Sequence, residues 1–250
     1  PGYTHMAPRN RDRNGWLLAV CGIDGSGKTV QADRLCDRAE AAGYAARSME
    51  FPRYGEGFFA ELVERYLRGD FGGEATDVSP YLAALPYAGD RWEAAETLRG
   101  WLDEGALVVC NRYVPANVAH QGGKIGDAAR REEFYRWVLK LEYEVYGIPR
   151  PDLHVWLDMP PAAAAGLSAG KDRQEYLKGR EDIHEQDLSH LRNTSEVYRW
   201  LHENEPNWAA VKCTSDDEIL SPESISERVW DTITQNLFPG TGADRRGSGT

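Results

Sequence analysis

The residues from Gly22 to Thr29 have the types and the spacing needed to hold the phosphates of a nucleoside triphosphate. They read Gly-Ile-Asp-Gly-Ser-Gly-Lys-Thr, which satisfies the phosphate-loop pattern GxxxxGK[ST] in full. The glycines let backbone N–H groups turn toward phosphate oxygens, and a following helix directs its positive end at them. Lys28 can reach the β- and γ-phosphates, and the Thr29 hydroxyl is a ligand for Mg²⁺. The motif predicts ATP binding by Gly22, Asp24, Gly25, Ser26, Gly27, Lys28 and Thr29.

A basic stretch later in the chain suits phosphoryl transfer. GTPases, motor ATPases and small-molecule kinases all share the phosphate loop, so the loop alone does not choose between them. The loop contains no arginine, so charge on a transferring phosphoryl group must be met by Lys28, Mg²⁺ and arginines from elsewhere. Residues 168–184 include Lys171, Arg173, Lys178 and Arg180. We expect this stretch to be a mobile lid, with Arg173 and Arg180 as catalytic residues beside Lys28; the sequence does not choose between the two arginines.

The elements that must position these groups alternate along the chain. Short apolar runs predict strands over residues 16–21, 45–51, 106–110, 153–157 and 208–213. Helical patterns cover residues 28–42, 58–67, 80–104, 128–146, 188–203 and 222–237, with a kink near Pro86. Strands separated by helices indicate parallel βαβ units with helices on both faces of one sheet. The predicted fold is α/β, a three-layer P-loop NTPase fold with a mainly parallel five-stranded sheet.

This fold class predicts where the chemistry takes place and how the chain is divided. Ligands bind such sheets at the carboxyl ends of the strands, so the segments after Cys21, Phe51, Cys110 and Leu157 should form the site. We expect one kinase domain over residues 14–238. Residues 1–13 and 239–250 lack apolar periodicity and are expected to be disordered tails.

Composition limits the partners and the compartment. The formal net charge of −11 argues against general binding to nucleic acid, because an acidic protein repels a polyanion. No apolar run approaches the roughly 18 residues that span a bilayer, and no secretory leader opens the chain, so we expect a cytoplasmic protein without membrane contact. The four cysteines show no metal-binding spacing, which favours buried, reduced thiols.

Several motifs, taken in order, resemble the thymidylate kinase family of nucleoside monophosphate kinases. The phosphate loop carries an acidic residue, Asp24, and Phe51-Pro-Arg-Tyr54 follows the second predicted strand. Further family-like segments are Tyr66-Leu-Arg-Gly-Asp-Phe-Gly72, Asp90-Arg91, Asn111-Arg-Tyr113 leading into Asn117, His120 and Gln121, and Leu157-Asp-Met-Pro-Pro161. The resemblance runs from about residue 17 to residue 237. It implies phosphoryl transfer from ATP to a pyrimidine deoxynucleoside monophosphate, most simply dTMP to dTDP.

The resemblance also implies roles for individual residues. Phe51 and Tyr87 would provide aromatic walls for a pyrimidine, Arg91 would donate to a base carbonyl, and Asn117 would read the amide-like edge of the base. Arg112 would hold the acceptor phosphate and act in catalysis, since a guanidinium matches two phosphate oxygens at once. Asp24 and Tyr54 would lie near the acceptor phosphate and sugar. Asn111, His120 and Gln121 complete the expected acceptor site, and Asp182 joins Thr29 as a candidate residue for Mg²⁺, the expected cofactor.

This chain departs from the family pattern at three positions. Asn111 stands where the family usually has aspartate, and asparagine binds Mg²⁺ more weakly than a carboxylate does. The acceptor phosphate, with a second pKa near about 6, needs no general base, so activity should survive. His120 replaces a tyrosine that walls the sugar in many members, and Leu167 replaces a common arginine. The change at residue 120 leaves open the preferred pyrimidine and the exclusion of ribonucleotides, and the change at residue 167 leaves open how the donor nucleotide is held.

The sequence is also compatible with other functions. One is a kinase for dUMP or a modified pyrimidine monophosphate. Another is a deoxynucleoside kinase, which would need a general base, and no obvious carboxylate comes right after the second predicted strand. A third is a catalytically inactive P-loop nucleotide-binding protein. The family resemblance further suggests a homodimer, formed by the helices of residues 81–101 or of residues 128–146.

Overall fold

The computed structural model describes residues 13–71, 78–171, 181–216 and 218–238, and the side chains among these except those of residues 168–171 and 181–187. Part of the expected lid, including Arg173 and Arg180, therefore lies outside the described residues. Asp182 falls in a helix, but its side chain is not described. The expected tails also lie outside, apart from Arg13. Arg13 forms an ion pair with Asp152 at 2.5 Å.

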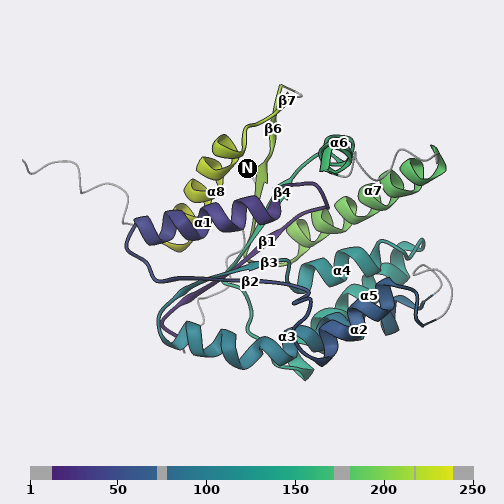
Figure 1. The fold of residues 1–250 in the computed structure, drawn as a ribbon, viewed down its shortest axis with the longest axis horizontal. Helices are drawn as coiled ribbons and strands as arrows, with labels where there is room; N and C mark the ends of the chain where they lie inside the picture. Colours follow the sequence, from purple (N-terminus) through teal and green to yellow (C-terminus); the bar gives the residue numbers. More distant parts are fainter. Residues whose placement is uncertain (1–12, 72–77, 172–180, 217, 239–250) are drawn as a thin grey trace, which may run out of the picture.

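A five-stranded parallel sheet forms the centre of the protein (Figure 1). Its strands are β1 (Trp16–Cys21), β2 (Ala46–Glu50), β3 (Leu107–Asn111), β4 (Leu153–Asp158) and β5 (Trp208–Lys212), arranged in the order β2-β3-β1-β4-β5. All four neighbouring pairs are parallel. Strands β1, β3 and β4 are buried on both faces, which is why they read as continuous apolar runs. The predicted sheet is thus confirmed.

Helices cover both faces of this sheet. In Figure 1, α1 (Lys28–Ala41) and α8 (Pro222–Leu237) lie together on one side, and α3 (Pro80–Asp103), α4 (Val114–Gly122) and α5 (Ala128–Lys140) lie on the other. Helix α2 (Phe58–Leu67) packs on α3, and one π-helical turn, η1 (Leu141–Val145), extends α5. The remaining elements are α6 (Pro161–Lys171), α7 (Glu181–Asn204) and a short hairpin of β6 (Thr214–Ser215) and β7 (Glu218–Ile219). The α/β prediction with helices on both faces is confirmed.

Some element predictions were wrong in ways that have a physical cause. Helix α4 was missed because nearly all of its residues are buried, so the sequence shows no contrast between an apolar and a polar face. Helix α6 was missed as well, and α7 begins at Glu181 rather than at Leu188, so both ends of the predicted lid are helical. Helix α3 continues through Pro86 as one element. Among the described residues, no helix is both long and apolar enough to cross a bilayer.

Candidate active site

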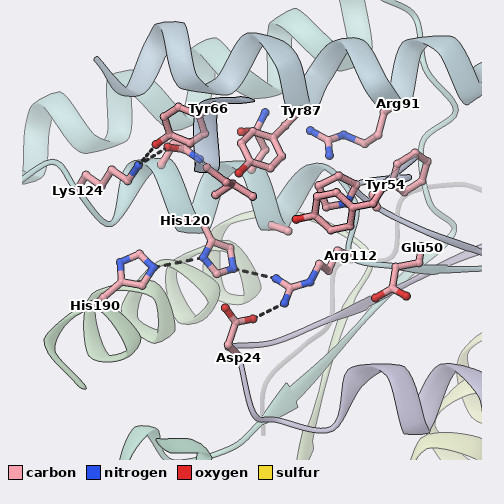
Figure 2. Close-up of a pocket in the computed structure, with 16 residues that line it drawn as sticks. Asp24, Glu50, Tyr54, Tyr66, Tyr87, Arg91, Arg112, His120, Lys124 and His190 are labelled. Carbon is pink, nitrogen blue, oxygen red and sulfur yellow. Dashed lines mark hydrogen bonds and ion pairs between the residues drawn. The ribbon is translucent and has the colours of Figure 1, made fainter. Parts of the chain in front are cut away.

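A cavity of about 410 Å³ lies where β1, β2 and β3 end and where α3, α4 and α7 approach them (Figure 2). Its size is typical of a small-molecule site. The sequence predicted ten acceptor-site residues, and nine of them line it: Asp24, Phe51, Tyr54, Tyr87, Arg91, Arg112, Asn117, His120 and Gln121. Its other lining residues are Glu50, Pro52, Tyr66, Leu67, Ala116, Lys124 and His190. Asn111 is the predicted residue that does not line it.

The phosphate loop connects β1 to α1 beside this cavity, and its glycines are required by the backbone. Gly22 has φ 146° and Gly27 has φ 85°, both in the left-handed range that favours glycine. A Cβ atom on Gly22 would lie 2.7 Å from Ser26 Oγ and 3.0 Å from the carbonyl oxygen of Leu157. The glycine therefore allows the loop to pass close to the end of β4. Gly27 is the N-cap of α1, so the positive end of that helix faces the loop.

Lys28 is folded over its own loop. Its Nζ donates to the carbonyl oxygen of Ile23 at 2.7 Å and lies 3.6 Å from Asp24 Oδ1. The residue is only 5% exposed, and burial lowers the pKa of Lys28 to about 7. Its charged form is therefore poorly stabilised without a ligand. An anion on the loop would favour the charged form, which is the form that neutralises phosphate.

Arg112 connects the phosphate loop to the acceptor cavity. It immediately follows β3 and has φ 62°, a conformation that costs a residue with a side chain about 1–3 kcal/mol and that concentrates at functional sites. Its Nη2 forms a short ion pair with Asp24, and its Nη1 lies 3.2 Å from Nε2 of His120. His120 in turn lies 3.4 Å from His190 on α7 (Figure 2). Asp24 of the phosphate loop, Arg112 after β3, His120 of α4 and His190 of α7 thus form one polar chain.

The protonation states along this chain follow from its chemistry. Arginine only donates, so Nε2 of His120 accepts the Arg112 bond and its Nδ1 carries the hydrogen that points to His190. Burial lowers the pKa of His120 to about 3, so this ring is neutral at pH 7. Burial alone would raise the pKa of Asp24, but the charge that His120 acquires in acid and the charges of Arg112 and Lys28 together lower it well below its usual range. Asp24 is therefore a carboxylate at pH 7.

A buried ionic network lies at the inner end of the cavity. Arg91 is 2% exposed and makes two bonds to Glu142, from Nε at 2.5 Å and from Nη2 at 2.7 Å. Glu142 lies in the π-helical turn η1 and is 0% exposed. Asn117 Nδ2 donates to the same carboxylate at 2.9 Å and to the carbonyl oxygen of Ala84 at 3.0 Å. These bonds fix the orientations of Arg91 and Asn117 toward the cavity.

This network leaves one donor edge and one acceptor for a ligand. Neither bond to Glu142 uses Nη1 of Arg91, so that edge can donate into the cavity. Both amide hydrogens of Asn117 are donated, to Ala84 and to Glu142, whereas its Oδ1 is buried and has no hydrogen-bond partner among the described residues. Buried acceptors without a partner are costly and call for an explanation. A ring with a carbonyl beside an N–H would satisfy both groups.

Aromatic rings surround the same volume. Phe51 is almost fully buried, packs on Tyr113 and lies under the Arg91 guanidinium, 5.9 Å from its ring centroid. Tyr87 and Tyr66 meet edge to face at 6.3 Å. Tyr54 is 56% exposed and lies above Arg112 in the view of Figure 2. The rings give the cavity flat walls that suit a planar heterocycle.

The segment that carries Phe51 and Tyr54 is held by the long helix α3. Asp90 accepts from the backbone N–H of Arg53 at 2.9 Å and from its Nε, also at 2.9 Å. The neighbouring residue on α3, Arg91, faces the cavity. Two adjacent residues of α3 therefore have different roles: Asp90 holds the segment that carries Phe51 and Tyr54, and Arg91 lines the cavity.

Asn111 has a different environment from the one expected of an acceptor-site residue. Its Nδ2 donates to Thr29 Oγ1 at 3.0 Å and to Glu50 Oε1 at 2.7 Å. Its Oδ1 is buried without a hydrogen-bond partner in the described part of the chain. The residue thus joins the first turn of α1 to the end of β2, at the edge of the cavity.

The oxygen atoms of Thr29 and Asn111 suit a hard divalent cation that is bound together with phosphates. The described residues contain no group of three or more His, Cys, Asp or Glu side chains that could bind a metal by themselves. Mg²⁺ at phosphate sites usually takes one or two protein oxygens, substrate phosphates and several waters. Thr29 Oγ1 is such an oxygen, and the unpartnered Asn111 Oδ1 can accept from water bound to the ion.

Sequence reasoning missed five residues with clear roles in this geometry: Glu50, Tyr66, Glu142, Lys124 and His190. Glu50 precedes Phe51 at the end of a strand, a position that could have identified it. Tyr66 is the first residue of the family-like segment Tyr66–Gly72, but the sequence gives no sign of the hydrogen bond that its hydroxyl accepts from Lys124 at 2.5 Å. Glu142 and His190 lie in polar helical stretches without any motif, so no local signal was present.

Comparison with known proteins agrees with this arrangement. The sequence model of the thymidylate kinase family matches residues 20–222. A thymidylate kinase from Mycobacterium tuberculosis is 31% identical over 185 residues, which cover 74% of this chain and 85% of that protein. One from Syntrophotalea carbinolica is 30% identical over 229 residues, covering 90% and 98%. The solved structure of a thymidylate kinase from Candida albicans has the same fold, with a TM-score of 0.64 at 18% identity over 90% of this chain and 93% of the other.

Proposed function

The chain belongs to the thymidylate kinase family, and from that membership we propose that it transfers the γ-phosphoryl group of ATP to dTMP, giving dTDP and ADP. The observation that carries the proposal is the cavity itself. One end has the donor edge of Arg91 and the unpartnered acceptor of Asn117, and the other end has Arg112 beside the phosphate loop. A pyrimidine monophosphate presents a carbonyl and an N–H at one end and a phosphate at the other.

In this proposal, the base lies between the aromatic walls and its edge faces the buried network. Arg91 Nη1 donates to a ring carbonyl, and Asn117 Oδ1 accepts from the ring N–H. Because Glu142 holds both side chains, little conformational entropy is lost when the base binds. Phe51 and Tyr87 provide the flat surfaces, and Tyr54 and Gln121 complete the cavity.

Arg112 is proposed to hold the acceptor phosphate. Its ion pair with Asp24 is partly exposed, so an incoming phosphate can share the guanidinium or replace the carboxylate. Asp24 would then be free to accept from a sugar hydroxyl. His120 supports Arg112 from the other side.

Phosphoryl transfer in this site requires positioning and charge neutralisation rather than a general base. The acceptor phosphate is largely a dianion at pH 7, with a second pKa near about 6, and can attack without losing a proton. Lys28 neutralises the β- and γ-phosphates once it leaves the Ile23 carbonyl. Arg173 and Arg180 are proposed as further donors to the transferring group, and Gly22, Gly25, Ser26 and Gly27 as the backbone cradle of ATP.

We propose Mg²⁺ as the cofactor, held by Thr29, the phosphates and water, with Asp182 as a further candidate. When bound, the ion would neutralise negative charge on the phosphates of ATP. We also propose one domain over about residues 14–238 acting in the cytoplasm as a homodimer. Trp92 on α3 and Val145 on η1, which are 53% and 66% exposed, support a dimer contact through these helices. Light scattering of the purified protein, with Trp92→Asp as the variant, tests the dimer.

An acceptor panel tests the proposed activity. ADP release from ATP and Mg²⁺ is followed with dTMP, dUMP, dCMP, dGMP, UMP and 5-substituted deoxyuridylates, and the diphosphate product is identified by chromatography. A strong preference for dTMP is expected. Preference for another pyrimidine monophosphate would leave the proposed mechanism intact and show that the proposed specificity is wrong. No ADP release with any acceptor, while ATP still binds, would refute the proposed activity and favour a nucleotide-binding protein.

A further inference from the structure

Glu50 has a position that neither the family pattern nor the acceptor pocket accounts for. It is the last residue of β2, an edge strand, and pairs in register with Asn111 on β3. Its side chain is exposed and lines the cavity on the side of the phosphate loop. A carboxylate that faces a site for a nucleoside triphosphate and a nucleoside monophosphate repels its ligands unless a cation lies between them. Its presence there therefore calls for a reason.

The bonds of Asn111 connect Glu50 to the metal-binding threonine. One amide nitrogen donates to Glu50 Oε1 at 2.7 Å and to Thr29 Oγ1 at 3.0 Å. The distance between Glu50 Oε1 and Thr29 Oγ1 is therefore no greater than the sum of these two hydrogen-bond lengths. The bond to Asn111 uses only Oε1, so Glu50 Oε2 can accept another hydrogen bond.

That separation suits an ion that Thr29 binds directly and that Glu50 reaches through water. Mg²⁺ binds oxygen at about 2.0–2.1 Å and keeps several of its waters, so a carboxylate one water away is within reach of this threonine. A carboxylate that accepts from metal-bound water orients the water and offsets the charge of the ion. An amide at residue 111 cannot supply the negative charge, although its Oδ1 can accept from the same waters.

We propose that Glu50 supplies the carboxylate of the Mg²⁺ site by accepting from water bound to the ion, and that Asn111 is a positioning residue that joins Glu50 to Thr29. In this way a glutamate on β2 provides the negative charge that other family members carry on β3. The inference rests on the proposed function, because that function requires Mg²⁺ with the nucleotide. It explains how a chain with asparagine at residue 111 keeps a complete site.

Metal affinity tests this inference directly. Mn²⁺ is titrated into the protein with a non-hydrolysable ATP analogue, and free Mn²⁺ is followed by electron paramagnetic resonance. Glu50→Gln is expected to weaken Mn²⁺ binding by about 10- to 100-fold, the usual effect of losing a partner to metal-bound groups. Glu56→Gln, an exposed carboxylate in the following loop that does not line the cavity, is the matched control and should bind Mn²⁺ like the wild type.

Two further measurements separate this role from a structural one. In EDTA, Glu50→Gln should bind the ATP analogue at least as well as the wild type, because a repulsive charge has been removed. Returning the carboxylate to β3 in the double variant Glu50→Gln with Asn111→Asp should restore most of the lost Mn²⁺ affinity. Thermal unfolding should not change in Glu50→Gln, since the side chain is exposed on an edge strand.

Unchanged Mn²⁺ affinity in Glu50→Gln would overturn the inference. It would also be overturned if Glu50→Gln lost the same affinity for the ATP analogue with metal and in EDTA. The proposed function would stand in that case if the wild type still transferred phosphate to dTMP. If instead the wild type showed no transfer to any monophosphate, the function would fail while the Mn²⁺ titration still decided the role of Glu50.

Discussion

Exchanging the buried Arg91–Glu142 pair should separate folding from recognition of the base. The pair is almost completely buried, and its carboxylate accepts three hydrogen bonds, two from Arg91 and one from Asn117. Removing one partner of such a pair leaves an uncompensated buried charge. Replacing both partners by apolar residues of similar size removes the charge altogether and is often neutral or stabilising.

The magnitudes follow from this burial. Arg91→Met alone should lower the free energy of unfolding by about 3–5 kcal/mol, because Glu142 then keeps a buried charge. The double variant, Arg91→Met with Glu142→Leu, should recover most of that loss. Binding of dTMP should not recover, because the donor to the base is absent in both variants. A hydrogen bond from a charged donor contributes about 1.5–3 kcal/mol, so the Kd for dTMP should rise roughly 10- to 150-fold.

Two assays read the two effects independently. Urea denaturation gives the free energy of unfolding, and calorimetric titrations give the affinities for dTMP and for ATP. The affinity for ATP is the internal control, since the phosphate loop lies at the other end of the cavity and should bind ATP normally in the double variant. Glu96→Gln, on the same helix but exposed, is a control for a charge change on α3.

Either of two results would refute this reasoning. Wild-type affinity for dTMP in the double variant would show that Arg91 does not contact the base. A fall in ATP affinity matching the fall in dTMP affinity would show that the acceptor pocket has been assigned to the wrong nucleotide.

Three further predictions concern the phosphate end of the site and its ionisation. Lys28→Ala should abolish transfer, measured as dTDP formation, while the fold is retained; near-normal turnover would be incompatible with the phosphate-loop mechanism. Arg112→Lys should raise the KM for dTMP about tenfold or more, because lysine cannot hold two phosphate oxygens at once, and an unchanged KM would place the acceptor phosphate elsewhere. The pKa of His120 is about 3 in the native state against an ordinary 6.5, so the unfolded chain takes up a proton on this residue between pH 6.5 and 3 and the native state does not. The free energy of unfolding should therefore fall as the pH drops from 7 to 5. Over that range, measured by urea denaturation, His120→Gln should lose about 2 kcal/mol less of this free energy than the wild type. Equal losses in the two proteins would contradict a neutral His120 ring in the native state.

The sequence determined those features that depend on neighbouring residues. The phosphate loop needs its glycines, lysine and threonine at fixed spacing, and these lie in a continuous run from Gly22 to Thr29. Strands β1, β3 and β4 are buried on both faces and read as short apolar runs, so the sequence predicted them. It also predicted β2 and β5, which are only partly buried, and the helices of residues 58–67 and 222–237. The carboxyl ends of parallel strands meet at one edge of a sheet, which is why nine predicted acceptor residues came together in one cavity.

Tertiary structure alone decided the partners of those residues. Arg91 pairs with Glu142, 51 residues away, and Asn111 joins Glu50, 61 residues away, to Thr29. No local pattern encodes such pairs, because the identity of a buried partner depends on which helices and strands pack together. Asn111 was expected to contact the acceptor, yet the register of β2 and β3 places its amide against Glu50. The sequence thus specified which groups the site contains, and the packing of β2, α4, η1 and α7 determined which of them are charged, paired and free to bind.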